Sequence, residues 1–486
     1  MGPRINRTLL ALASGGLGTL AFAPFSWWWL GIISLALWMV LTRHWPSFWT
    51  GFWYGFGLFA SGVSWVSVSM IDHGGASLGL AWLMTGAFAA GLAIFPGLAS
   101  MAYGAWNRRW PTPFRQVMLL MACWVTLEAL RSWALTGFPW LIFGYAALDS
   151  PFEGYLSWVG SFGVSALMAT VAGTCLAALL ARSVKPLWVA IPILVGGPLL
   201  DRAHQIPSPE TEVSVALWQP VIQQSEKWRL EARDGIVANH VREGLPLSVS
   251  LIVWPETALP MTDQAALRML PDLDTLLKRD GQTLITGVLG QDDGRYTNRL
   301  LTLGVGQGLY DKTRLVPFGE YVPLEQWLRG LIAFFDLPMS SIVPGSRQDH
   351  LVHESLVMAP LICYEIAYTG LARSLSKDAN AILTVSNDTW FGDSIGPDQH
   401  LEIARIRARE LAKPVIRATN DGWTALIDAR GTVTQQLPRF SPGLLQGTVA
   451  PVSITTPYAH AGEVPLILWL VILLTLTRKN QASDVA

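Results

Sequence analysis

The chain is poor in charged side chains. Only 14% of its 486 residues are Asp, Glu, Lys or Arg, whereas 51% are hydrophobic and the mean hydropathy is +0.36. Soluble globular proteins carry about 25% charged residues, so the composition excludes an ordinary soluble protein and predicts a membrane protein. The net charge of −1 provides no basic surface, and we expect no nucleic acid among the partners.

Two common ligand-binding signatures are also missing. The phosphate-binding pattern G-x-x-x-x-G-K-[ST] does not occur, and the eight histidines are scattered without an H-E-x-x-H motif. These patterns carry the side chains that hold nucleotide phosphates and zinc. We therefore expect no metal ion and no cofactor.

Apolar residues gather in long runs, chiefly in the first 200 positions. Each run approaches the ~20 residues that a helix needs to cross the hydrocarbon core of a bilayer. We expect eight transmembrane helices, seven before a more polar domain and one after it. The runs are 9–23, 27–41, 48–70, 78–103, 117–133, 156–180, 186–199 and 458–477.

Lys and Arg indicate how these helices are oriented, because basic residues collect in cytoplasmic loops. They occur in alternate short connections, and the intervening loops have none. The pattern predicts an N-terminal membrane domain (1–204), an extracytoplasmic domain (205–456), and a last helix with a short cytoplasmic tail (457–486). Both termini would be cytoplasmic. The basic residues are Arg4, Arg7, Arg43, Arg108, Arg109, Arg115, Arg182, Lys185, Arg478 and Lys479.

The fifth apolar run contains an ionisable pair. Glu128 and Arg131 are three residues apart and lie on one helical face, which lowers the cost of placing either in lipid. Two interpretations stay open, a functional site within the membrane and a structural clamp near its outer surface.

The polar domain alternates β-rich runs with helical patterns, which is typical of an α/β layered fold. We expect a turn at "GVGQG" (304–308), and a helix at 401–413 whose Arg405, Arg407 and Arg409 form a solvated face. The expected strands are 213–218, 250–254, 283–289, 356–362, 381–386, 415–419 and 424–428.

Cys363 is the only cysteine of the polar domain, because Cys123 and Cys175 fall within expected membrane helices. An unpaired thiol outside the cytoplasm is unusual unless it is buried in a core or used chemically. Glu256 and Lys312 follow other apolar runs. A carboxylate can take the proton of a thiol, and a cation can favour the thiolate and hold an oxyanion. Spacings of 56 and 51 residues mean that only the fold can bring the three together.

These three positions resemble the nitrilase superfamily, with Glu256 in W-P-E, Lys312 ahead of L-V-P-F-G-E and Cys363 in I-C-Y-E. Over nearly its full length the chain resembles the apolipoprotein N-acyltransferase family, the membrane-bound branch of that superfamily. It departs at Arg314, where His is expected, and at Lys413, where Arg is usual. The further matching segments are "LTGFPWLIFGY" (135–145), "WQPVIQQSEKW" (218–228), "SNDTWFG" (386–392) and "ARIRARELAKPVIRATNDGWTALID" (404–428).

The resemblance implies an α-β-β-α sandwich for the polar domain and a bacterial inner-membrane enzyme with this domain on the periplasmic side. It implies Glu256 as general base, Lys312 as oxyanion and thiolate stabiliser, and Cys363 as nucleophile. The implied donor is a phospholipid of the phosphatidylethanolamine type, and the implied acceptor is the N-terminal amine of a diacylglyceryl lipoprotein. Supporting roles are implied for Glu320, Tyr364, Glu365 and Trp228.

Three alternatives stay open. A membrane-anchored amidase would use the same three residues with water as the acceptor. A serine hydrolase would use G-x-S-x-G at Ser77 or Ser394, although neither serine directly follows an expected strand. A lipid-binding membrane protein without catalytic activity would leave the combination of Glu256, Lys312 and Cys363 unexplained.

Overall fold

The structure is a computed structural model that describes residues 3–109, 112–203, 206–207, 211–246, 248–317, 319–321 and 342–478. The chain forms two compact units. A helical unit comprises Met1–Ser67, Leu78–Gln205 and Thr456–Ala486, and an α/β unit comprises Val68–Ser77 and Ile206–Thr455. The α/β unit thus includes a short piece of chain, 68–77, from within the apolar N-terminal part of the sequence.

The helical unit is built from apolar helices that approach closely where residues are small. A Cβ atom added at Gly15 of α1 would lie 1.9 Å from the Tyr54 carbonyl oxygen of α3, and one at Gly57 would lie 2.1 Å from that of Leu12. Glycine therefore lets the two backbones touch, as is common between membrane helices. The helices are α1 (Pro3–Thr19), α2 (Trp28–His44), α3 (Phe48–Gly62), α4 (Val66–Asp72, shared with the α/β unit), α5 (Leu78–Trp106), α6 (Pro113–Arg131), α7 (Leu156–Ala181), α8 (Ala190–Ala203), α16 (Pro457–Ala461) and α17 (Val464–Arg478).

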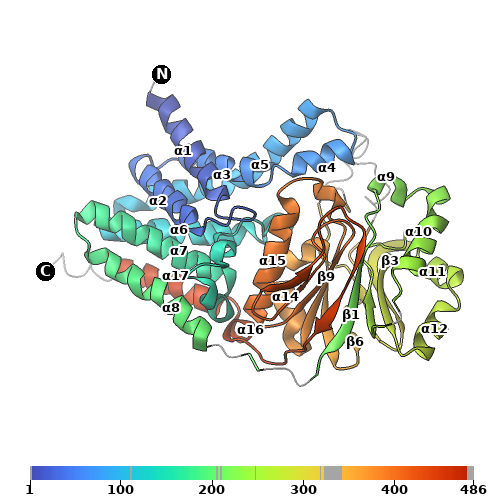
Figure 1. Ribbon diagram of the computed structural model, residues 1–486. Helices are drawn as coiled ribbons and strands as arrows, with labels where there is room; N and C mark the ends of the chain where they lie inside the picture. The colour runs from blue at the N-terminus through green and yellow to red at the C-terminus, as the bar shows by residue number, and fades with distance from the viewer. Residues whose placement is uncertain are drawn as a thin grey trace. The chain divides into compact units, whose positions relative to one another are not determined.

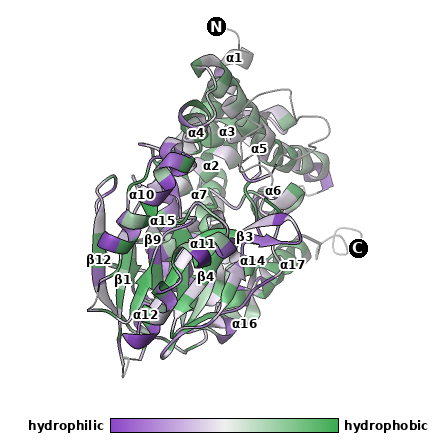
Figure 2. Cartoon of the chain, turned by 90° about the vertical axis from the view of Figure 1, so that its right-hand side faces the viewer, coloured by the Kyte–Doolittle hydropathy of each residue, from purple (hydrophilic) through white to green (hydrophobic). Residues whose placement is uncertain are grey.

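The expected count of eight transmembrane helices needs correction. Among the described residues, four helices are long and apolar enough to cross a membrane, and α3 and α4, bent by 50° at their junction, pass as a fifth when taken together. The apolar character of α3 and α5 is visible in Figure 2. The long helices are Leu78–Arg109, Pro113–Arg131, Glu153–Ala181 and Lys185–Ala203.

The other expected spans are too short. Helices α1 and α2 have 17 residues each, and the apolar part of α17 is Val464–Leu476. At ~1.5 Å per residue such helices rise less than the ~30 Å of a hydrocarbon core. The sequence pattern marks apolar runs but does not show where their helices begin and end.

Glu128 and Arg131 hold a loop of the helical unit. The Nη1 atom of Arg131 donates to the carbonyl oxygens of Phe138 at 2.5 Å and Trp140 at 2.8 Å, and the amide of Phe143 donates to Glu128 Oε1 at 2.9 Å. Both side chains are buried. These contacts favour the structural-clamp interpretation over a functional site.

The α/β unit contains two six-stranded sheets with similar internal patterns. The first has the order β12-β1-β2-β3-β4-β5, with β1, β2 and β3 parallel. The second has the order β11-β10-β9-β8-β7-β6, with β7, β8 and β9 parallel. The strands are β1 (Val213–Gln219), β2 (Leu251–Val253), β3 (Thr283–Asp292), β4 (Arg295–Gly304), β5 (Leu309–Asp311), β6 (Leu351–His353), β7 (Leu356–Ile362), β8 (Ala381–Ser386), β9 (Val415–Thr419), β10 (Ala425–Ile427), β11 (Val433–Gln436) and β12 (Gly443–Val449).

Helices cover the outer face of each sheet, so the α/β unit has four layers, α-β-β-α (Figure 1). Helices α14 and α15 lie against the second sheet, and α10, α11 and α12 lie against the first. Parallel strands need both faces covered, because both carry apolar side chains. The helices are α9 (Gln224–Lys227), α10 (Leu230–Glu243), α11 (Asp263–Met269), α12 (Leu273–Arg279), α14 (Thr369–Leu375) and α15 (Gly396–Leu411).

Helix α15 corrects the expectation of a solvated arginine face. Arg407 and Arg409 are buried, and Arg405 is partly buried. Arg407 donates through Nε to the carbonyl oxygen of Ile366 at 3.1 Å and forms an ion pair with Glu410. Charged residues at helical spacing occur both on a face that meets solvent and on a buried face whose ions pair within the protein. The sequence pattern alone therefore does not separate the two cases.

The buried Arg299 on β4 provides a test of the first sheet. Its guanidinium group contacts the carboxylates of Asp263 and Asp311 at 2.6 Å each, and also that of Asp292. Arg299→Leu would leave buried Asp311 without its cation, and we expect the free energy of unfolding to fall by about 3–5 kcal/mol. Denaturant titration followed by tryptophan fluorescence measures this change.

Arg279→Leu is the matched control, because Arg279 pairs with Asp280 on the surface at 2.8 Å. Exposed ion pairs contribute roughly 0–1 kcal/mol. Equal losses in the two variants would contradict a structural role for the Arg299 cluster.

Candidate active site

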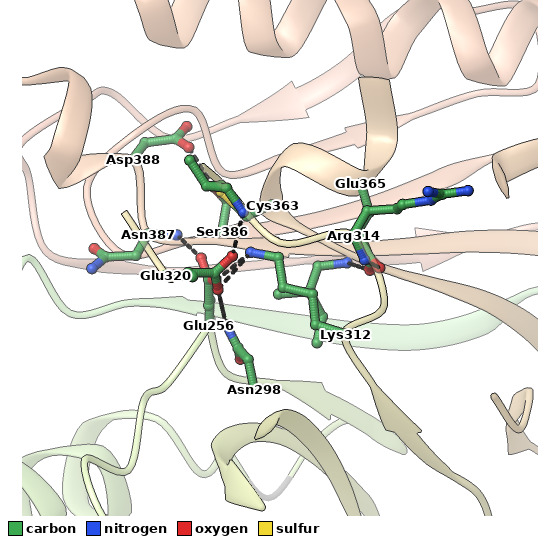
Figure 3. A network of polar contacts seen from close by, with 12 residues as sticks. Glu256, Asn298, Lys312, Arg314, Glu320, Cys363, Glu365, Ser386, Asn387 and Asp388 are labelled. Carbon is green, nitrogen blue, oxygen red and sulfur yellow. Dashed lines mark hydrogen bonds and ion pairs between the residues drawn. The ribbon is translucent and has the colours of Figure 1, made fainter. Parts of the chain in front are cut away.

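The sequence-predicted residues come together at strand ends. Lys312 directly follows β5, Cys363 directly follows β7, and Glu256 lies a few residues beyond β2. Ligand and catalytic sites of α/β folds form at the carboxyl ends of parallel strands, where successive loops meet. Figure 3 shows the three side chains gathered in one place although they arise from different strands.

A buried ammonium group lies between two carboxylates. The Nζ atom of Lys312 is 3.0 Å from Glu320 Oε1 and 3.4 Å from Glu256 Oε1, and Lys312 is 1% exposed. Burial opposes the charged form, but the charges of Glu320 and Glu256 outweigh it and raise the pKa of Lys312. Lys312 is therefore a permanent cation at neutral pH.

Glu256 is held by neutral donors as well. The side-chain amide of Asn298 donates to Glu256 Oε1 at 2.7 Å and to Glu320 Oε1 at 3.2 Å. The backbone amide of Asn387 donates to Glu256 Oε2 at 2.8 Å. Both oxygens of the carboxylate are thereby oriented, as a base needs to be before it can accept a proton.

Lys227 fixes the backbone of the same residue. It is buried, and its Nζ donates to the Glu256 carbonyl oxygen at 3.0 Å. Burial lowers the pKa of Lys227 to about 8, against the opposing effect of Glu256 and Asp421. The only sequence signal for Lys227 was its place beside Trp228 in the matching segment 218–228.

Cys363 is a partly exposed residue in an unusual backbone conformation. Its φ of 54° is in the left-handed region, which side-chain-bearing residues rarely adopt and which often marks functional positions. Burial raises the pKa of Cys363, as does Glu256, while Lys312 and a hydrogen bond with Ser386 act in the opposite direction. The resting side chain is thus a thiol and needs a base, because Lys312 does not offset the burial.

Glu365 joins the loop of Lys312 to the turn of Cys363. Its Oε1 accepts hydrogen bonds from the backbone amides of Thr313 at 2.7 Å and Arg314 at 3.0 Å. Its Oε2 accepts from the Tyr310 hydroxyl and the Ile362 amide, both at 2.9 Å. Burial raises the pKa of Glu365, against these backbone donors. The buried carboxyl group therefore connects the two strand ends that carry the cation and the thiol.

Tyr364, Trp228 and Ser394 are further predicted positions that the structure describes in the α/β unit. Tyr364 follows Cys363 and its ring meets that of Tyr368 edge to face, with 5.2 Å between centroids. Trp228 follows Lys227 at the end of α9, and among the described residues its buried Nε1 has no hydrogen-bond partner. Ser394 donates to the Phe391 carbonyl oxygen at 2.6 Å and accepts from the Gly396 amide, so its hydroxyl caps its own turn.

Residues of the site that sequence reasoning missed are Asn298, Asn387 and Lys227, each of which contacts Glu256. Asn387 falls within the matching "SNDTWFG" segment directly after β8, so its position offered a signal. Asn298 lies in the middle of β4, and no local pattern sets it apart.

Comparisons with known proteins show the family of each part of the chain. Residues 214–457 match the carbon-nitrogen hydrolase family model, and residues 14–174 match the apolipoprotein N-acyltransferase N-terminal domain. The α/β unit is thus a carbon-nitrogen hydrolase domain with the nitrilase-like fold. A CN-hydrolase superfamily protein of Xanthomonas campestris is similar at 18% identity and a TM-score of 0.37, over 53% of this chain and 97% of that one.

Curated relatives match over most of their length. An apolipoprotein N-acyltransferase of Pseudomonas syringae pv. tomato is 42% identical over 95% of this chain and 94% of its own. One of Pseudomonas aeruginosa PAO1 is 40% identical over 94% of this chain and 93% of its own. The chain belongs to the apolipoprotein N-acyltransferase family.

The charge of Glu256 provides a test of the site's electrostatics. Glu256→Gln removes a negative charge that raises the pKa of Cys363. We therefore expect the pKa of Cys363 to be lower in this variant, by about one pH unit or more. The rate of iodoacetamide alkylation against pH, with the modified peptide identified by mass spectrometry, measures the inflection. Glu231→Gln on the exposed face of α10 is the control, and an unchanged or higher inflection in Glu256→Gln would contradict the assigned electrostatics.

Proposed function

We propose that the chain transfers a fatty acyl group from a phospholipid of the phosphatidylethanolamine type to the N-terminal amine of a diacylglyceryl lipoprotein, through a thioester on Cys363. The observation that carries the proposal is the convergence of Cys363 with the buried Glu256 and Lys312 at neighbouring strand ends. Membership of the acyltransferase family supports the reaction class.

In the first half-reaction Glu256 takes the proton of the Cys363 thiol, and the thiolate attacks the carbonyl carbon of the phospholipid ester. Lys312 stabilises the oxyanion of the tetrahedral intermediate with a charge that is already in place. The intermediate collapses by breaking the ester C–O bond, and Glu256 returns the proton to the leaving alkoxide. A lysophospholipid departs, and the acyl group stays on sulfur.

In the second half-reaction the amine of the lipoprotein attacks the thioester carbonyl carbon. An α-amine has a pKa near ~8 and is therefore partly neutral and nucleophilic at neutral pH. Glu256 takes a proton from the attacking nitrogen, the C–S bond breaks, and Cys363 regains its proton. An ester has been exchanged for a more stable amide, so the cycle requires no nucleotide.

The supporting residues act through these three. Glu320 holds Lys312, and its Oε2 is itself held by the Val316 amide at 2.9 Å. Glu365 keeps the cation and the thiol at a fixed separation. Tyr364 directly follows the nucleophile in the chain, and Trp228 directly follows Lys227, whose Nζ holds the Glu256 carbonyl oxygen. We assign both aromatic side chains to contacts with the acyl donor.

The α/β unit would lie outside the cytoplasm, on the periplasmic side of the inner membrane. Five crossings precede residue 205 when α3 and α4 count as one. The consecutive helices α1 and α2 would add two crossings or none, so the number of crossings before residue 205 stays odd. An odd number puts the N-terminus and the α/β unit on opposite sides of the membrane. Lys and Arg in alternate connections place the N-terminus in the cytoplasm.

An amidase that uses water is the second candidate, because the same three residues serve both reactions. The match of residues 14–174 to the acyltransferase N-terminal domain favours acyl transfer, since a hydrolase of small amides needs no lipid-facing helices.

The thioester is directly testable. Incubation of the detergent-purified protein with phosphatidylethanolamine should give a hydroxylamine-labile adduct of fatty-acyl mass on Cys363, detected by intact-protein mass spectrometry. Cys363→Ala should give none, and Glu256→Gln should form it about 10²–10⁴-fold more slowly because general-base catalysis is lost. An adduct on Ser77 or Ser394 in an active preparation would refute the proposal.

Sidedness is testable by labelling. A cysteine introduced at exposed Arg279 of the α/β unit, in a Cys363→Ala background, should react with a membrane-impermeant maleimide in intact spheroplasts. A cysteine at exposed Arg182, between α7 and α8, should react only after lysis. The reverse pattern would place the α/β unit in the cytoplasm.

A further inference from the structure

The turn that carries Cys363 is held from outside by one helix. Cys363 begins the short 3-10 turn η7 (Cys363–Ala367) with its φ of 54°. His400 Nε2 of α15 is 3.2 Å from the Cys363 carbonyl oxygen, and Arg407 Nε of α15 donates to the Ile366 carbonyl oxygen at 3.1 Å. His400 and Arg407 are seven residues apart, close to two helical turns, and so lie on one face.

The other nitrogen of His400 faces a buried ion pair. His400 Nδ1 lies 3.0 Å from Asp388 Oδ1 and 3.1 Å from Arg417 Nη2. Arg417 Nη2 also donates to Asp388 Oδ2 at 2.8 Å, and the Ser386 hydroxyl donates to Asp388 Oδ1 at 2.5 Å. The side chains of His400, Asp388 and Arg417 are fully buried. Asp388 directly follows Asn387 (Figure 3), whose backbone amide contacts Glu256.

The partners determine where the His400 proton lies. The Cys363 carbonyl oxygen can only accept, so Nε2 must carry a hydrogen. Burial and the charge of Arg417 lower the pKa of His400, which is therefore neutral at neutral pH. Nδ1 faces both Asp388 and Arg417, and Asp388 in turn accepts from Ser386 and Arg417. Burial opposes ionisation of Asp388, but the charge of Arg417 and the hydrogen bond from Ser386 act in the opposite direction, and the pKa of Asp388 is lowered.

A fixed carbonyl group fixes a whole peptide plane. The carbonyl of Cys363 and the amide of Tyr364 belong to one planar trans unit and point in opposite directions. The direction of this unit and the left-handed conformation of Cys363 together fix the Cα–Cβ direction from which the thiol extends. A misplacement of about 1 Å at a reacting atom can cost about 10²-fold in rate.

We propose that His400, oriented by Asp388 and Arg417, is a positioning residue that holds the Cys363–Tyr364 peptide in the geometry needed for acylation. His400 takes no part in the proton transfers and does not contact the substrate. The inference rests on the proposed function, because acylation of Cys363 is the step that it serves.

Single-turnover acylation by phosphatidylethanolamine tests the proposal in the full-length protein in detergent. His400→Leu has no donor for the Cys363 carbonyl, and we expect its maximal acylation rate to fall about 10²-fold. The phospholipid concentration for half-maximal rate should stay unchanged. His400→Gln retains an N–H donor, and its maximal acylation rate should be at least tenfold higher than that of His400→Leu.

Alkylation separates positioning from loss of structure. Iodoacetamide, applied to all variants at one common pH, needs an accessible thiolate but no aligned acyl donor, and Glu256 and Lys312, which act on the ionisation of the thiol, are unchanged in these variants. His400→Leu should therefore be alkylated within about twofold of the wild-type rate. His350→Leu is the matched control, because His350 Nε2 likewise contacts a backbone carbonyl, that of Leu375 at 2.7 Å, away from the site.

The outcomes are distinct. A wild-type protein that forms no thioester would refute the proposed function itself. Three results would overturn the positioning role alone. The first is a His400→Leu protein that is acylated as fast as the wild type, and the second is an equal loss of acylation rate in His400→Leu and His400→Gln. The third is a loss of alkylation rate in His400→Leu that matches its loss of acylation rate.

Discussion

The ion cluster around Lys312 is the constraint on which the site depends. An ammonium group that is 1% exposed is tolerated only where carboxylates and hydrogen-bond partners replace its water. Glu320 and Glu256 provide the charges, and both carboxylates need donors in turn, which explains Asn298 and the amides of Val316 and Asn387. The geometry of the base and the cation thus follows from the electrostatics of burial.

The two sheets contribute different chemistry to this cluster. The base and the cation follow strands of the first sheet, β2 and β5, whereas the thiol and the Asn387 amide follow β7 and β8 of the second. The hydrogen bonds from Asn387 to Glu256 and from Tyr310 to Glu365 connect the sheets at the site. A proton can pass from sulfur to carboxylate only while the sandwich keeps these strand ends in register.

Sequence reasoning was strongest where local pattern and burial coincide. Strands β7, β8 and β9 have the predicted bounds, because each is rich in apolar and β-branched residues and ends before polar or turn residues. Strands β5, β6 and β12 were missed, as were β4 and β11, since β4 begins with Arg295 and Tyr296 and β11 is mostly exposed. Strands β4 and β11 are both antiparallel to their neighbours and lack the continuous apolar run that marks a central parallel strand.

The site could be predicted by residue type and family pattern at Glu256, Lys312 and Cys363, whose roles remain proposals. Its surroundings could not, because a hydrogen-bond partner such as Asn298 is chosen by distance in space. Helix α15 shows the same limit, since no sequence pattern distinguishes an arginine that faces water from one that caps a buried turn. Short membrane helices were overcounted because hydropathy reports composition without helix length.

The pairing of β1 with β12 has a consequence for biosynthesis. The first strand of the α/β unit is hydrogen-bonded along its length to the last, from Val213 opposite Val449 to Gln219 opposite Gly443. The edge of the first sheet therefore stays open until residues 443–449 have left the ribosome, whereas Cys363 and its turn emerge earlier. The order of synthesis makes assembly of the catalytic cluster a late event, so that a nascent chain carries its thiol before the sheet of its base is complete.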